Sequence, residues 1–315
     1  MKEIGGYIEL DTYSQTMLHE GAIRLNCGRN ALAYLIKAKH IKKIYIPKFL
    51  CDSVRNVCKR ENVIIEYYSI GTDFLPANLP EELDGWLYFV NYYGQIRNSI
   101  IKELANKYTE MIVDNVQAYF QTPVGGIDTI YSCRKFFGVA DGSFLYTDTL
   151  LKDELEQDVS YNRMNFLLGR FERNASEFYQ EYVKNNDLFD DEPIKKMSKL
   201  TDNLLHAIDY KKVKKQRKEN FQTLHNSFKT INKLVLTVPN GAFIYPLYVE
   251  NGAEIRKELQ KMKIYIPTLW PDTFDVCDED DIQCHMAQNI LPLPCDQRYG
   301  KEEMAYVIEK LKNVL

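Results

Sequence analysis

Short apolar runs alternate with amphipathic stretches through the first half of the chain. Six of these runs have the composition of β-strands: 41–47, 62–70, 85–94, 111–115, 128–133 and 142–147. Between several of them apolar positions recur at helical spacing, which predicts helices over 29–39 and 99–107. Strands separated by helices favour βαβ units, so we expect an α/β fold with a mostly parallel central sheet sandwiched by helices.

The pattern changes after about residue 150. Strand signals vanish from 150 to 228, where charged, helix-forming sequence takes over. Three apolar runs and two helical stretches follow: 234–238, 243–250 and 263–270 as strands, with helices around 253–262 and over 301–315. We therefore expect a large domain over residues 1–200, followed by a linking helix and a small C-terminal α/β domain over 201–315.

Composition and charge are those of a globular protein that stays out of membranes. The 315 residues are 45% hydrophobic and carry a net charge of −4, which gives no footprint for nucleic acid or an anionic membrane. No apolar run approaches the roughly 20 residues that span a bilayer. Seven cysteines, an odd number without a secretion signal, predict reduced thiols in the cytoplasm. The basic run 211–218 lacks interleaved aromatic residues and is interpreted as a solvated helix face.

A carboxylate and an amine follow two of the predicted strands. Asp114 follows the apolar run Met111–Val113, and Lys135 comes shortly after the run that ends near Ser132. Strand carboxyl ends line the ligand crevice of an open parallel sheet, so both side chains are expected there. Pyridoxal phosphate (PLP) needs this pair: a lysine for its aldehyde and a carboxylate that keeps its ring nitrogen protonated. Taken singly, each residue is as readily an exposed cation or a strand-end cap.

The remaining needs of PLP have candidates nearby. Gly28 and Arg29 begin a predicted helix, whose first N–H groups could bind the phosphate, and Arg29 could add a charge. An ordinary glycine turn explains this segment equally well. Ser132 could donate its hydroxyl to the same phosphate, and Gln117 could reach the ring hydroxyl. We predict no metal site, because the histidines and cysteines lack ligand spacing.

These motifs resemble a known family when they are taken in order. They are Cys27–Leu32 (CGRNAL), Ile46–Cys51 (IPKFLC), Val90–Gln95 (VNYYGQ), Val113–Gln117 (VDNVQ), the Ser132–Gly142 stretch and the closing Ile290–Tyr299 segment. Together they are similar to fold-type I PLP enzymes of the DegT type, aminotransferases that act on nucleotide-linked keto-sugars. The resemblance covers nearly the whole chain and implies a fold-type I PLP-dependent transferase fold.

The resemblance also implies roles for individual residues. Lys135 would form the imine with PLP and carry the proton, Asp114 would pair with the ring nitrogen, and Gln117 would orient the ring hydroxyl. Ser132 and the backbone of Gly28 and Arg29 would hold the phosphate.

Three further positions are cofactor candidates by the same resemblance. Asn91 replaces the family's histidine, and the ring-stacking aromatic falls on or near Cys51, so that Phe49 or another residue takes that part. Asn162 lies in a stretch similar to the family's N-x-R-M. In that family the asparagine of this motif reaches the partner's active site, so the resemblance implies a homodimer with shared sites.

The function implied is transfer of an amino group from an amino acid, such as glutamate, to a nucleotide-linked keto-sugar for surface polysaccharide or glycan biosynthesis. Two alternatives stay open: a PLP-fold protein without turnover that acts as a binding or assembly partner, and a PLP enzyme that acts on an amino acid. Trp270 falls in the substrate loop, where it either contacts substrate or anchors the core.

Overall fold

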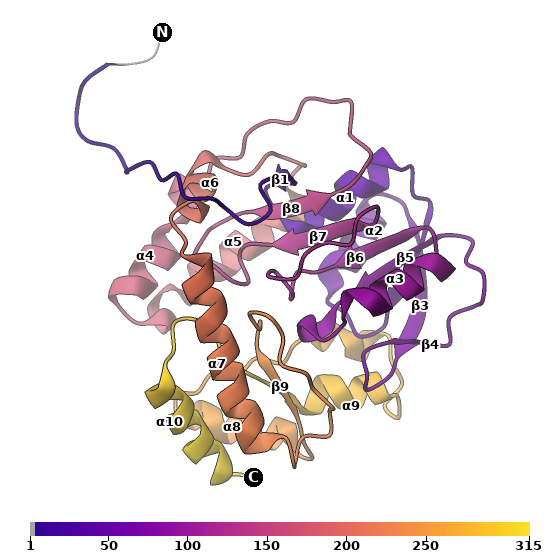
Figure 1. Cartoon of the computed structure of the whole chain (residues 1–315), viewed down its shortest axis with the longest axis vertical. Coiled ribbons are helices and arrows are strands. Elements are labelled where there is room, and N and C mark those ends of the chain that lie inside the picture. The colour runs from indigo at the N-terminus through magenta and orange to yellow at the C-terminus, as the bar shows by residue number, and fades with distance from the viewer. Residues whose placement is uncertain (1–3) are drawn as a thin grey trace.

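The computed structural model describes residues 4–315, and an eight-stranded sheet forms its centre (Figure 1). The strands are β1 (Ile23–Leu25), β2 (Lys43–Pro47), β3 (Ile64–Ile70), β4 (Pro76–Ala77), β5 (Trp86–Val90), β6 (Met111–Asp114), β7 (Asp128–Ser132) and β8 (Ser143–Tyr146). Their order across the sheet is β1-β8-β7-β6-β5-β2-β3-β4. Each predicted strand of the first half is confirmed, although the one predicted over 85–94 ends at Val90.

The central strands β3, β2, β5, β6 and β7 run parallel, so their carboxyl ends share one edge of the sheet. β8, β1 and β4 are antiparallel to their neighbours. β1 was not predicted, because three residues are too few to show alternation. Its pairing of Ile23 with Leu145 gives the sheet an antiparallel margin beside the predicted site.

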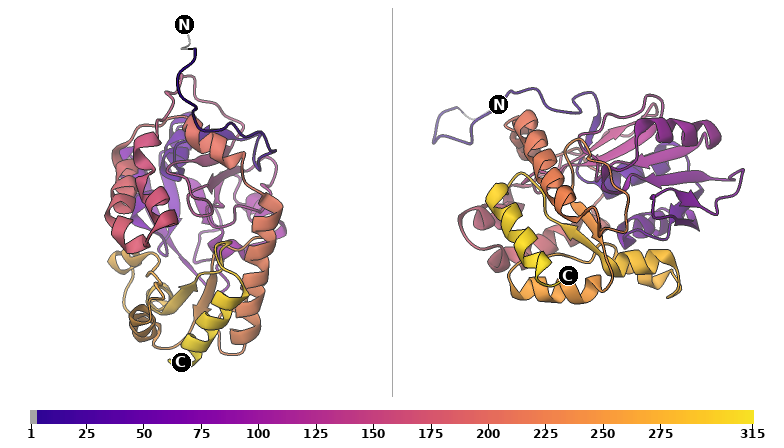
Figure 2. Two further views of the ribbon diagram at one scale, coloured as in Figure 1. Left: turned by 90° about the vertical axis from the view of Figure 1, so that its left-hand side faces the viewer. Right: turned by 60° about the horizontal axis from the view of Figure 1, so that its bottom comes forward.

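Helices cover both faces of the sheet (Figures 1 and 2). The helices of the first half are α1 (Gly28–Ala38), α2 (Asp52–Arg60) and α3 (Asn98–Lys107). α1 buries seven consecutive residues, Asn30 to Ile36, and packs against α2, β7 and β8. α3 crosses the front of the sheet in Figure 1, and only Ile101 of this helix is fully buried. This layering confirms the predicted α/β fold.

The second half is mostly helical. Its helices are α4 (Asn165–Glu172), α5 (Tyr179–Asp191), α6 (Lys199–Leu205), α7 (Tyr210–Phe228), α8 (Gly252–Lys261), α9 (Ile282–Asn289) and α10 (Lys301–Lys312). Short 3-10 helices are η2 (Tyr161–Arg163), η3 (Ala175–Phe178) and η4 (Pro271–Asp275), and η1 (Tyr92–Gly94) lies in the first half, directly after β5. β9 (Tyr245–Tyr248) and β10 (Ile290–Leu293) form a separate antiparallel pair. α7 runs from the large sheet down to this C-terminal part (Figure 1).

Two of the strands predicted in the second half are wrong. The structure assigns no strand to residues 234–238 or 263–270, and Lys263 and Trp270, at the two ends of the second segment, have left-handed φ values of 61° and 54°. Their side chains do alternate: Leu234 and Leu236 are buried while Val235 is 98% exposed. The alternation predicts which face of an extended segment is buried, but it cannot supply a neighbouring strand. The first of these segments is held instead by side chains, as where Gln95 Oε1 accepts from Thr237 N at 2.8 Å.

The buried apolar side chains form two clusters. The larger one extends from the sheet into the C-terminal part, so that Ile44, Phe221 and Leu293 belong to one continuous core. The smaller one surrounds the segment after β7 and includes Tyr131 and Phe136. The proposed division at residue 200 therefore crosses a shared core, and it stays a prediction. Of the helices within residues 4–315, none combines the length and apolarity needed to cross a bilayer.

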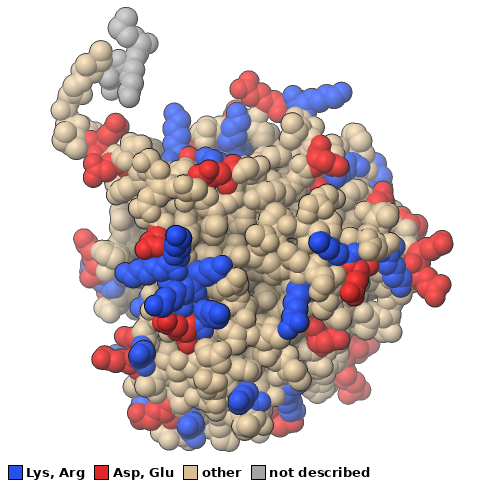
Figure 3. Space-filling model, in the orientation of Figure 1, with Lys and Arg blue, Asp and Glu red and all other residues tan. Residues whose placement is uncertain are grey.

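The basic run 211–218 forms the first turns of α7. Figure 3 shows lysine and arginine side chains gathered over the place where α7 begins in Figure 1. Lys211, Lys212, Lys215 and Lys218 are exposed, which fits the interpretation of a solvated face. Arg217 departs from it, because its side chain is fully buried.

Candidate active site

Asp114 ends β6 at the carboxyl edge of the sheet and is almost fully buried. Its carboxylate accepts hydrogen bonds from Tyr88 Oη at 2.7 Å and from the backbone N–H of Val116 at 2.9 Å. Burial raises the pKa of Asp114, and the charge of Lys135 together with these two hydrogen bonds opposes the rise. The carboxylate is thus a buried anion whose two hydrogen-bond donors are neutral.

Lys135 lies in the turn between β7 and β8, close enough for its charge to act on Asp114. The turn is closed by the carbonyl of Cys133, which accepts from the N–H groups of Phe136 and Phe137 at 2.9 Å each. The side chain is exposed, and its Nζ lies 5.5 Å from the ring centre of Phe243. The strand order therefore brings the predicted lysine and aspartate together, because β6 and β7 are neighbours.

Gly28 and Arg29 form the first turn of α1 beside Asp114. A Cβ placed on Gly28 would lie 3.8 Å from Val116 Cγ1, so the start of α1 approaches the segment that follows Asp114. The first N–H groups of a helix have no partner within it and can bind an anion. The guanidinium of Arg29 is engaged elsewhere, with Nε 2.9 Å from Asp190 Oδ1. The backbone N–H of Arg29, rather than its side chain, is therefore placed to bind a phosphate.

Gln117 and Ser132 lie near the same edge. Gln117 is buried, and its Oε1 accepts from Tyr93 N at 2.8 Å, which leaves its amide N–H groups to donate. Tyr93 has a φ of 55°, a conformation that is rare outside glycine and asparagine. Ser132 ends β7 opposite Ser143 and is half-buried.

The aromatic candidates are part of the core. Phe49 is 1% exposed and its ring centre lies 4.6 Å from that of Trp270, which is 6% exposed. Trp270 therefore packs in the core, as the second of its two interpretations predicts. Cys51 precedes α2 and is half-buried, with Sγ 2.8 Å from Ser53 Oγ.

The two predicted asparagines lie in opposite surroundings. Asn91 is fully buried and its side chain bonds Asn115, Gln121 and the backbone of Ile96, so it holds the loop after β5 together. Asn162 lies on the exposed η2 and lines a hollow of about 750 Å³. The first therefore belongs to the support of the site, whereas the second is free to contact another molecule.

Residues that sequence reasoning missed support the site from behind. Tyr88 points from β5 to Asp114, and an aromatic run gives no signal for such a bond. Asp141, in the D-G pair after Lys135, accepts from the N–H and hydroxyl of Ser198 at 2.7 Å each and from the Thr201 hydroxyl. Asp141 thereby ties the start of α6 to the turn of Lys135.

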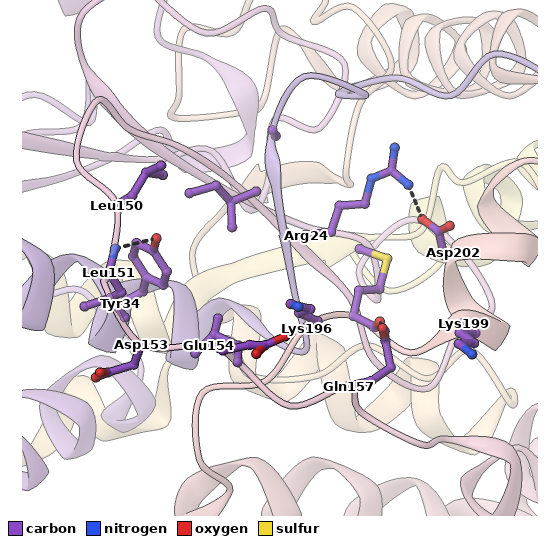
Figure 4. Close-up of a pocket in the computed structure, with 14 residues that line it drawn as sticks. Arg24, Tyr34, Leu150, Leu151, Asp153, Glu154, Gln157, Lys196, Lys199 and Asp202 are labelled. Atoms are coloured by element: carbon purple, nitrogen blue, oxygen red, sulfur yellow. Dashed lines mark hydrogen bonds and ion pairs between the residues drawn. The ribbon is translucent and has the colours of Figure 1, made fainter.

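A separate hollow of about 570 Å³ lies along β1 (Figure 4). It is lined by Arg24, Tyr34 and Leu151 among others, and Arg24 pairs with Asp202 at 2.7 Å. None of the predicted cofactor residues lines it. Within residues 4–315, no three His, Cys, Asp or Glu side chains gather in a way that could hold a metal ion.

The fold is that of PLP-dependent sugar aminotransferases of known structure. The chain is similar to NtdA from Bacillus subtilis with bound cofactor PMP, at a TM-score of 0.68 and 15% identity over 93% of this chain and 73% of that one. It is similar to a DegT DnrJ EryC1 StrS aminotransferase from Brucella abortus, at a TM-score of 0.64 and 13% identity over 93% and 86% of the two chains. It is also similar to the sugar aminotransferase CalS13 from Micromonospora echinospora, at a TM-score of 0.62 and 13% identity over 93% and 87%.

Comparison of sequences alone does not detect this likeness. No protein-family model matches the chain, and no curated protein matches it. At 13–15% identity the structural likeness establishes the fold, which is the predicted fold-type I α/β fold.

Proposed function

We propose that this protein is a PLP-dependent aminotransferase that moves an amino group from an amino acid, such as glutamate, to a nucleotide-linked keto-sugar for surface polysaccharide or glycan biosynthesis. The observation that carries the proposal is the buried carboxylate of Asp114 beside the charge of Lys135 at the carboxyl edge of the sheet. The structural relatives named as sugar aminotransferases support the substrate class.

The residues present fit PLP. Asp114 is a buried carboxylate with two neutral hydrogen-bond donors, and a protonated ring nitrogen would supply the positive partner that such an anion needs. When bound, PLP supplies the electron-withdrawing ring on which amino-group transfer depends. The hydrogen bonds from Tyr88 and from the Val116 N–H fix the orientation of the Asp114 carboxylate, so that a ring nitrogen would approach it from one direction.

The other residues of the chain have parts that follow from their positions. The first N–H groups of α1, at Gly28 and Arg29, would bind the phosphate, with the Ser132 hydroxyl beside them. Gln117 keeps its amide N–H groups for the ring hydroxyl, since its oxygen is taken by Tyr93 N. Lys135 would bind the aldehyde and carry protons at its Nζ, where its exposed side chain is open to substrate.

We also propose a homodimer with shared sites. Several large apolar side chains between residues 159 and 179 are exposed on the single chain: Val159 61%, Tyr161 75%, Leu168 61%, Phe171 92% and Tyr179 58%. Apolar surface concentrated in one segment is typical of an interaction surface. Asn162 lies in the same segment, so a second copy packed there would receive Asn162 in its site.

A spectroscopic experiment tests the proposal. Purified protein mixed with PLP should develop a visible absorption band, and Lys135→Ala should remove the band while Lys102→Ala, on the exposed face of α3, keeps it. Adding glutamate and then a nucleotide-linked keto-sugar should bleach and restore the band. Protein that binds no PLP would contradict the proposal. A band that no amino acid bleaches would leave the fold as a binding partner, the alternative function.

A further inference from the structure

Arg217 is a buried charge, and among residues 4–315 no carboxylate forms an ion pair with it. It lies on α7, is 2% exposed, and burial lowers its pKa to about 10, so it stays protonated at neutral pH. Its hydrogen bonds go to the side-chain oxygen of Gln297 and to three backbone carbonyls. Removing a guanidinium from water is costly unless bonds of good geometry replace the water. Such a residue is better explained by what it holds in place than by a gain in stability.

The acceptors of Arg217 surround Lys135. Nη2 donates to the carbonyl of Phe136 at 3.2 Å, and Nη1 donates to the carbonyls of Ala242 at 2.8 Å and Phe243 at 3.3 Å. Phe136 directly follows Lys135, and the ring of Phe243 lies beneath the Lys135 Nζ. One guanidinium thus restrains both the backbone that carries the lysine and the ring on which its ammonium rests.

Gln297 closes the arrangement from the C-terminal part. Its Nε2 donates to the carbonyl of Phe136 at 2.7 Å, while its Oε1 accepts from Arg217 Nε at 2.6 Å. The loop that carries Gln297 is itself anchored to α7, since Asn220 Nδ2 donates to the carbonyls of Cys295, Asp296 and Tyr299. Two donors from distant parts of the chain therefore converge on one carbonyl oxygen. We call Arg217, Gln297 and the Phe136 carbonyl the carbonyl clamp.

We infer that Arg217 and Gln297 are positioning residues that hold Lys135 at the angle and depth needed to react with PLP. The inference rests on the proposed function for its chemistry, and Lys135 remains the catalytic residue. A small displacement of a reacting group costs about two orders of magnitude in rate, which is why a restrained carbonyl next to the lysine matters. The carbonyl clamp also couples the site to the C-terminal part, because it needs α7 and the loop after β10 to be docked.

Two variants and a matched control test the carbonyl clamp. Arg217→Lys keeps the charge but cannot reach four acceptors, and Gln297→Ala removes one donor while leaving Arg217 intact. Arg256→Lys is the control, because Arg256 is a half-buried arginine that likewise donates to backbone carbonyls, those of Gln288 and Ile290, on the C-terminal part. Each of the three changes removes a side-chain donor to a backbone carbonyl, but only Arg217→Lys and Gln297→Ala touch the turn of Lys135.

Two readouts are taken on the full chain. The first is hydrogen exchange of the segment 133–139 without cofactor, which should quicken about tenfold in the two clamp variants and stay unchanged in Arg256→Lys. The second is the rate at which added PLP becomes trapped on Lys135 by borohydride, which should fall about tenfold or more in the same two variants. The double variant should lose little beyond the single ones, because both residues act on one oxygen.

The outcomes separate this inference from the proposed function. Clamp variants that match Arg256→Lys in both readouts would overturn the inference, even where the wild type binds PLP. If the wild type takes up no PLP, the proposed function fails, and the exchange readout alone decides whether the turn is held by the carbonyl clamp. Should Arg217→Lys fail to fold, Gln297→Ala carries the test.

Discussion

Asp114 is placed where its charge is unfavourable without a cofactor. Burial raises its pKa, so the folded state disfavours the anion, and the chain is less stable above that pKa than it would be with a neutral group. Such a cost is typical of a residue kept for function rather than for stability. Replacing Asp114 with asparagine, its neutral isostere, should therefore raise the stability of the free chain while removing the charge that function needs.

Asp114→Asn should stabilise the cofactor-free protein and abolish PLP uptake. At pH 7 we expect its melting temperature to exceed that of the wild type by about 2 °C, the shift that roughly 1 kcal/mol produces in a chain of this size. Below about pH 3 the difference should vanish, because the carboxyl is then protonated in both the folded and the unfolded chain. Calorimetry at the two pH values measures it. A less stable variant at pH 7 would show that the ionised carboxylate is not costly in the free chain.

His19 predicts a pH dependence of the opposite sign. Its ring bonds the carbonyl of Tyr119 and the hydroxyl of Tyr146, and burial lowers its pKa from 6.5 to about 4. The folded state holds the neutral ring, so stability is full above pH 6.5 and falls as the pH drops toward 4. His19→Asn, which tolerates the φ of 66°, removes this titration.

Urea unfolding at pH 7 and pH 5 measures the effect. Between these values the wild type should lose about 1–2 kcal/mol more than His19→Asn. Parallel losses in the two proteins would show that His19 does not titrate differently in the folded chain.

The turn between β7 and β8 depends on α6, a helix that carries no catalytic group. Asp141 accepts from the N–H and hydroxyl of Ser198, the residue that precedes α6, and from Thr201 within it. Asp141→Ala leaves these buried donors without an acceptor and should cost about 2–4 kcal/mol in the free energy of unfolding. Asp148→Ala is the control, because that carboxylate is 77% exposed in its pair with Lys39 and should cost under about 1 kcal/mol. Equal losses would refute the anchoring role.

Six strands of the large sheet could be predicted from the sequence, whereas the short strands β1 and β4 could not, and two strands predicted in the C-terminal part do not form. β2, β5 and β6 are apolar along their length except for Lys43 at the start of β2 and Asp114 at the end of β6, which is typical of strands buried on both faces. Segments 234–238 and 263–270 show the alternation of strands, yet each lacks a neighbour to pair with. Strand pairing depends on which other segment of the chain lies alongside. The hydrophobic periodicity of one segment carries no information about its neighbour.

The residues of the site also divide into those that could be predicted from the sequence and those that could not. Asp114 and Lys135 were predictable because parallel strands place their carboxyl ends together. Arg217 was hidden in a basic run whose other members are solvated, and Gln297 lies 80 residues farther along. Their roles depend on three segments that meet only in the folded chain. For the same reason the sequence could not show that Arg29 pairs with Asp190.

The assembled protein should be a dimer built on the segment 159–179. Phe171 is 92% exposed, and Phe171→Asp should give a monomer that retains its fold and loses transfer activity at least tenfold. Val235→Asp is the control, because Val235 is 98% exposed on a different segment and should leave the dimer intact. Light scattering after gel filtration measures both. A wild type that is monomeric at micromolar concentration would contradict the shared-site arrangement.

The most direct measurement is to locate the residue that binds PLP. Wild-type protein is mixed with PLP, reduced with borohydride, digested and analysed by mass spectrometry. We predict one modified peptide, with the reduced adduct on Lys135, and none in Lys135→Ala. An adduct on any other lysine, or an even spread over the exposed lysines of α7, would contradict the assignment of this site.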